Sequence, residues 1–148
     1  MPKSKVLDTG DLLRLLRENG DFAKALEHSE HAINNPSLVM QLLQYQKECD
    51  MSIPQIADAA MLSHSFAYQI FSGVRNPGRN TLICIACVMR LPLEGVQRLL
   101  TISQKGELYP RVRRDAAIIF ALEHGYALMQ MEELLQKAGE ASILPKPY

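Results

Sequence analysis

The fold is decided by the stretch Ser52-Ile-Pro-Gln-Ile-Ala-Asp-Ala-Ala-Met-Leu-Ser-His-Ser-Phe-Ala-Tyr-Gln-Ile-Phe-Ser-Gly-Val-Arg-Asn-Pro77. Ser52 and Gln55 have the spacing of a capping box, which predicts a helix that begins here and ends near Ala60. Ser63 is a second N-cap residue, and the helix that follows it closes at Gly73, where a left-handed cap is expected. The stretch therefore predicts two short helices joined by a turn of about three residues.

Helical spacing continues on both sides of this stretch. Asn35 and Pro36 predict a helix start, with Asn35 as the cap and Pro36 at the first helical position. Further helices are expected over 79–90, from Leu93 to about Leu100, and over 111–124 and 127–138. No segment alternates with the period of a strand, and no Asn-Gly or Asp-Gly hairpin turn occurs. The chain is therefore predicted to be all-α.

Two short helices separated by about three residues inside a five-helix bundle are the arrangement of a DNA-binding helix-turn-helix. Ala57 would lie where the two helices cross, and Leu62 would fill the turn. Ser63 would leave first-turn N–H groups available near a phosphate. The domains expected are an N-terminal helical extension (1–34), a helix-turn-helix domain (35–104), a C-terminal helical hairpin (105–142) and a tail (143–148).

At these residues the chain resembles the Cro/lambda-repressor-like (Xre-type) helix-turn-helix family. The resemblance covers about residues 37–103, including a Gly-x-Arg-x-Pro turn at 73–77 and the fourth and fifth helices of the family. It implies a five-helix repressor-type core flanked by short helical extensions. Two positions depart from the family pattern: Met61 stands where glycine is usual, and Phe71 where an acidic residue is common.

The resemblance implies a DNA-contacting role for two groups of residues. Base edges in the major groove would be met by the second helix of the motif, through His64, Ser65, Phe66, Tyr68 and Gln69. Phosphates would be held by Ser52, Ser63, Arg75, Asn76, Arg79 and Asn80. The alternative is that His64, Ser65 and Gln69 form a solvated helix face, and that Phe66 and Tyr68 pack on a neighbouring element.

The charge is zero over the whole chain, with 16 Lys+Arg and 16 Asp+Glu, but it is unevenly distributed. By segment it is −2 over 1–50, +5 over 51–114 and −3 over 115–148. The positive part coincides with the expected DNA-binding half, so the neutral average does not exclude DNA.

The cluster Arg111, Arg113 and Arg114 opens a predicted helix, where cations are unfavourable. Contact with phosphate or with an acidic partner would explain the cluster, and a solvated first turn partly offset by Asp115 is the alternative. The helix that follows, 114–123, is apolar almost all round and is expected to be buried. It would pack within the chain or at a dimer interface, as in repressors that read palindromic sites.

Several other patterns are interpreted as structural. Cys84 and Cys87 have metal-ligand spacing but lie in an apolar helix, so they are expected in the core. His28 and His31 are interpreted as surface residues, and the pair Glu132-Glu133 as part of a solvated helix face. No catalytic motif, metal site or cofactor motif is present, so neither an enzyme nor a cofactor is expected.

The sequence leads to two functional hypotheses. The first is a transcriptional regulator of bacterial, phage or mobile-element origin, which binds double-stranded DNA as a homodimer. The second is an adaptor or inhibitor that uses the same fold to bind a protein partner. Since the chain begins without a signal peptide and its longest apolar run is too short for a bilayer, we expect a cytoplasmic protein without membrane contact.

Overall fold

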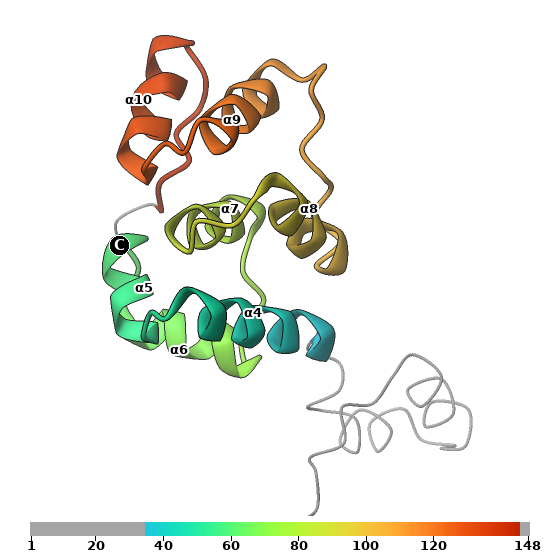
Figure 1. Cartoon of the computed structure of the whole chain (residues 1–148), viewed down its shortest axis with the longest axis vertical. Coiled ribbons are helices and arrows are strands. Elements are labelled where there is room, and N and C mark those ends of the chain that lie inside the picture. Colours follow the sequence, from blue (N-terminus) through green and yellow to red (C-terminus); the bar gives the residue numbers. More distant parts are fainter. Residues whose placement is uncertain (1–34, 146–148) are drawn as a thin grey trace, which may run out of the picture.

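The computed structural model describes residues 35–145, and these form helices and loops with no strand. The helices are α4 (Pro36–Cys49), α5 (Ile53–Ala59), α6 (His64–Ser72), α7 (Arg79–Val88), α8 (Leu93–Ile102), α9 (Arg113–Glu123) and α10 (Leu128–Lys137). They stack in three layers, with α4, α5 and α6 below, α7 and α8 in the middle, and α9 and α10 above (Figure 1). The prediction of an all-helical chain is confirmed for this part. The expected N-terminal extension, 1–34, and with it His28 and His31, lie outside the described residues.

The helix starts follow the capping signals in the sequence. The Asn35 side chain accepts from the Leu38 N–H at 3.3 Å, and Pro36 occupies the first helical position. Ser52 and Gln55 form the predicted capping box, and Ser63 caps α6. These caps satisfy first-turn N–H groups that have no partner inside their helices.

Gly73 ends α6 in the left-handed conformation, with φ 85°. A side chain at this position would also meet Val39, because a Cβ built on the backbone lies 2.9 Å from Val39 Cγ2. Glycine is therefore required here both by the backbone angle and by the close approach of α4.

The turn between α5 and α6, defined by its backbone hydrogen bond to a buried alanine, occurs three times within residues 35–145. In each case a left-handed residue and one apolar residue precede the next N-cap, and the left-handed residues are Met61, Arg90 and Gly125. In each case the N–H of the apolar residue bonds to the carbonyl of a fully buried alanine, at 2.8, 3.1 and 2.9 Å; these alanines are Ala57, Ala86 and Ala121. The pairs α5–α6, α7–α8 and α9–α10 are thus three versions of one hairpin.

The last two hairpins also share their connections to the loops that follow them. Arg79, at the start of α7, donates to the carbonyls of residues 106 and 107 at 3.1 and 3.0 Å. Arg114 in α9, 35 positions later, donates to the carbonyls of residues 141 and 142 at 3.1 and 3.0 Å. The donor and both acceptors of the second set lie 35 positions after those of the first set, which indicates an internal repeat.

A second pair of contacts has the same offset. The side chain of Gln97 accepts from the Leu108 N–H at 2.7 Å and donates to the Leu108 carbonyl at 2.8 Å. Glu132 accepts from the Ile143 N–H at 3.0 Å. Leu108 and Ile143 are both buried in the core. Residues 79–108 and 114–143 are therefore two repeats of one unit, a helical hairpin whose following loop folds back over it.

Within residues 35–145 only one side of α9 is buried, through Asp115, Ile118 and Ala121, and Phe120 on the other side is 45% exposed. Burial within the chain therefore accounts for one side of this helix, and a dimer interface stays the open alternative for the other. One expectation for the C-terminal region is wrong. Glu132 is not solvated but buried under the loop that it holds. Ile143, the first residue of the expected tail, is buried in the core.

Candidate nucleic-acid interface

The helix α6 has one side buried in the core and one side open to solvent. The residues predicted to contact bases can be assigned to one side or the other. Ala67, Ile70 and Phe71 face the core. His64, Ser65 and Tyr68 are exposed, while Phe66 and Gln69 are half-buried at the edges of the open side. All five side chains proposed for base contact therefore lie on the open side of α6 or at its edges, and α5 packs beside it.

The first turn of α6 is linked to α5 by an exposed pair, in which His64 Nε2 lies 2.7 Å from Asp58 Oδ1. Ser63 accepts from the Phe66 N–H at 3.1 Å, so its hydroxyl hydrogen stays available for an acceptor such as a phosphate oxygen. Asp58 is the one acidic side chain of α5 and opposes an approaching phosphate.

The turn geometry alone does not select α6 as a DNA-reading helix, because α8 and α10 follow the same turn. Their composition differs, however. Glu94 lies in the first turn of α8, and Glu132 and Glu133 lie in α10. Helix α6, with the sequence HSFAYQIFS, carries no acidic residue. Among these three helices, it is the one whose own side chains do not repel a phosphate backbone.

The loop after α6 presents Arg75 and Asn76 to solvent, as the phosphate-contact prediction requires. The loop is held by the Arg75 N–H, which donates to the Gln69 carbonyl at 3.1 Å, and by the buried Pro77. The Arg75 guanidinium has no partner among the described residues. This places a free cation immediately beyond the C-terminal end of α6.

Arg79 and Asn80 are placed differently from Arg75. Arg79 donates from Nη1 and Nη2 to the two carboxylate oxygens of Asp115 at 3.1 and 3.0 Å, in addition to its two loop carbonyls. Asn80 Oδ1 accepts from Arg114 at 3.1 Å. Both residues therefore join the second repeat to the first, and the four donor contacts of Arg79 are satisfied within the chain.

The basic cluster at the start of α9 is also largely engaged. Arg113 donates from Nη2 to the Ala138 carbonyl at 2.9 Å, and its Nε lies 3.7 Å from Glu140 Oε1. Arg114 is bonded to its loop and to Asn80. Arg111 is exposed and has no partner among the described residues. Of the three arginines, Arg111 is the one that is left for a partner molecule.

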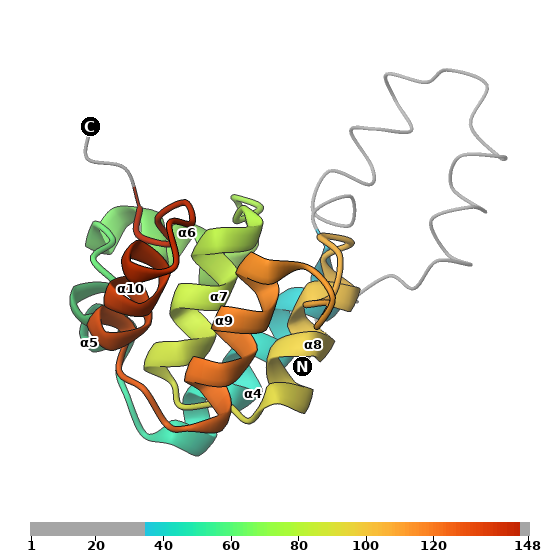
Figure 2. The same ribbon diagram turned by 90° about the horizontal axis from the view of Figure 1, so that it is seen from above.

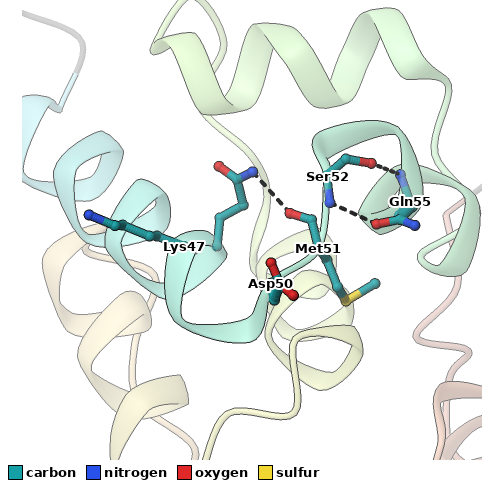
Figure 3. A pocket seen from close by; sticks show the side chains of 6 residues that line it. Lys47, Asp50, Met51, Ser52 and Gln55 are labelled. Carbon is teal, nitrogen blue, oxygen red and sulfur yellow. Dashed lines mark hydrogen bonds between the residues drawn. The ribbon is translucent and has the colours of Figure 1, made fainter.

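Ser52 borders a shallow hollow of about 440 Å³ between the end of α4 and the start of α5 (Figure 3). The hollow is lined in part by the cation Lys47 and the anion Asp50, with the capping box of Ser52 and Gln55 at its edge. Lys47 was not among the predicted contacts, because nothing in its local pattern shows that the turn after α4 brings it near Ser52. It is a second exposed cation on the α4–α6 layer.

Two buried carboxylates stabilise the repeats. Burial acts to raise the pKa of Asp115, but hydrogen bonds from Arg79 and the Tyr109 N–H, with the charges of Arg79 and Arg114, hold it below its ordinary value. Burial likewise opposes ionisation of Glu132, and donors from Ser142, Ile143 and Gln136 lower its pKa overall. Both groups are therefore charged at neutral pH and bind donors inside the chain.

Cys84 and Cys87 are buried, as predicted. Burial and the neighbouring Cys87 raise the pKa of the Cys84 thiol to about 12, and burial raises that of Cys87. Within residues 35–145, no group of three His, Cys, Asp or Glu side chains is arranged to hold a metal ion. No helix in this part of the chain is long and apolar enough to cross a membrane.

Comparison of the chain with protein-family models, with curated proteins and with solved structures finds no match.

Proposed function

We propose that the chain binds double-stranded DNA through α6 and acts as a transcriptional regulator of the repressor-type helix-turn-helix class. The observation that carries this proposal is the open side of α6, which combines hydrogen-bonding side chains, a capped first turn and no acidic residue. Gln69 can bond adenine through both amide atoms, and Ser65 and His64 can meet base edges or phosphates. In this arrangement α5 lies across the backbone, and α6 enters the major groove.

The phosphate contacts are fewer than the segment charge of +5 indicates. Arg75 and Lys47 are the exposed cations near α5 and α6, while Arg79, Arg113 and Arg114 make contacts within the chain. Each neutralised phosphate contributes about −0.9 to the slope of log K against log salt. We therefore expect a slope of about −2 for each bound protomer. A slope of about −5 would show that about three further cations of the chain reach the backbone.

The test is to select bound sequences from a random duplex pool and then to measure binding to the enriched site by fluorescence anisotropy. Gln69→Ala should reduce the preference at one base position, at a cost of about 1–3 kcal/mol, and leave non-specific affinity nearly unchanged. Gln44→Ala, an exposed glutamine on α4, is the matched control. If the pool shows no enrichment and low salt gives no binding, the proposal is wrong.

A second candidate function is the binding of a protein partner by the same surface. The observation that favours it is the set of exposed apolar side chains on and beside α6: Met61 is 56% exposed, Tyr68 50% and Val74 65%. Exposed apolar and aromatic side chains are typical of protein interfaces. The Tyr68→Ala variant distinguishes the two functions, because a protein interface would lose this anchor whereas the salt dependence of DNA binding would stay unchanged.

A further inference from the structure

The outer side of α9 carries an apolar stripe that the described chain covers only in part, through the His124 ring stacked on Phe120 at 4.0 Å between ring centroids. Val112 is 47% exposed and Phe120 is 45% exposed, and Ala116 and Ile119 between them are half-buried. These positions follow one face of the helix, opposite Ile118 and Ala121 in the core. Figure 2 shows the molecule from above, with α9 and α10 as the layer nearest the viewer and α7 behind α9.

The internal repeat shows that this side corresponds to a buried surface. On α7, Cys84 Sγ contacts the Ile143 carbonyl at 3.2 Å and Cys87 Sγ contacts the Tyr126 carbonyl at 3.6 Å, so both face the second repeat. The residues 35 positions later are Ile119 and Leu122, which are only half-buried. The second repeat thus presents the surface on which, in the first repeat, a neighbouring hairpin packs.

A terminal repeat that needs no neighbour carries a polar outer side. Here Phe120 occupies the position of Ile85, which is fully buried in α7. The outer side of α9 is therefore not built as a cap, and its exposed apolar side chains indicate an interface.

Opposite charges at the two ends of α9 make an antiparallel pair of these helices self-complementary. Arg111, just before α9, and Glu123, at its end, are both exposed. Each lies at the end of the helix where its charge is unfavourable. When two copies of α9 cross in antiparallel orientation, Arg111 of each copy lies near Glu123 of the other, and both unfavourable charges are offset.

We propose that a second copy of this chain occupies the outer side of α9, through an antiparallel pairing of the two α9 helices about a two-fold axis near Ala116. The small side chain of Ala116 permits a close crossing, and Phe120 packs beside it on each copy. The two chains would meet through their second repeats. The side of the first repeat that faces away from the second repeat is already covered by α4 and α5. This proposal does not rest on DNA binding.

The experiment is sedimentation equilibrium of the full chain without DNA, from about 1 to 100 μM, a range that brackets micromolar affinity. We expect a monomer–dimer equilibrium. Phe120→Glu should weaken it at least tenfold, because it places a carboxylate at the centre of each half-interface. Met40→Glu is the matched control: Met40 is 58% exposed on α4, and its replacement should leave the dimer intact.

A charge exchange tests the orientation. Glu123→Arg and Arg111→Glu should each weaken the dimer, and the double variant should regain most of the lost affinity. Circular dichroism melting checks that each variant is folded. A wild-type chain that stays monomeric over the whole range would overturn the proposal, as would equal effects of Phe120→Glu and Met40→Glu. A double variant weaker than both single variants would show that the antiparallel orientation is wrong.

Discussion

The role of Arg79 differs most between the sequence-based prediction and the structure. Replacing Arg79 distinguishes a phosphate contact from a structural contact between the two repeats. The resemblance to repressors assigns it to a DNA phosphate. In the structure it joins the two repeats, with donor–acceptor distances of 3.0–3.1 Å to two loop carbonyls and to both oxygens of Asp115. We therefore predict that Arg79→Ala lowers the stability of the fold and leaves DNA affinity of the folded protein nearly unchanged.

The size of the effect follows from the burial of the pair. The Asp115 side chain is 7% exposed and the Arg79 side chain 27% exposed. Removing one partner of a buried pair costs about 3–5 kcal/mol. Because the guanidinium is partly solvated, we expect the lower end, about 3 kcal/mol, for Arg79→Ala. For a chain of this size, that corresponds to a fall in Tm of about 10 °C. Arg79→Lys should recover little, because an ammonium cannot make the bidentate contact.

The assay is urea unfolding followed by circular dichroism, for Arg79→Ala, Asp115→Asn and the double variant. The two single changes should be strongly non-additive, since both break the same contact. Arg75→Ala is the control: Arg75 is exposed and has no partner in the described chain, so its loss should weaken DNA binding and leave stability unchanged. A cost below about 0.5 kcal/mol for Arg79→Ala, the usual range for surface substitutions, together with a loss of DNA binding like that of Arg75→Ala, would contradict a structural role for Arg79.

Two further predictions concern the buried titratable groups. Asp115 and Glu132 have a lower pKa in the folded chain than the ordinary value of about 4. The stability that these two carboxylates contribute is therefore complete above about pH 5 and is lost as the pH falls further. The urea midpoint should drop steeply below about pH 4, and less so in Asp115→Asn. In the folded protein at pH 8, a thiol reagent should modify Cys49, which is partly exposed, and spare Cys84 and Cys87; fast reaction of all three thiols without denaturant would contradict the burial seen here.

The elements that the sequence predicts well are those with local causes. Asn35, Ser52 and Ser63 each bond an N–H three residues later, and Gly73 ends its helix because of its own backbone angle. Met61, which stands where glycine is usual in the family, takes the left-handed conformation, with φ 61°. All five signals act within a few residues, so a reader of the sequence can recognise them without knowing the tertiary structure.

The contacts that join the repeats could not be predicted in the same way. Arg79 binds Asp115 over 36 positions, and Glu132 is buried only because the chain at Ile143 returns over it. The repeat itself is difficult to see, because Gln97 corresponds to Glu132 and the two units share few identical residues. The signal that could have revealed it is the recurrence of an arginine and of a Leu-Leu pair at a spacing of 35, at Arg79 and Arg114 and at 99–100 and 134–135.

The repeat also changes the interpretation of the basic segment. Its charge of +5 suggested a DNA-binding surface, but Arg79 and Arg114 serve the same structural purpose in successive units, holding a loop and an adjoining hairpin. The electrostatic attraction left for DNA is therefore small in one protomer. Because each protomer supplies few phosphate contacts, tight binding to a site would depend on base contacts by α6 and on a second protomer on the same duplex. The open side of α6 and the outer side of α9 would then be needed together. The first would contact a DNA half-site, and the second would hold two protomers together as a dimer.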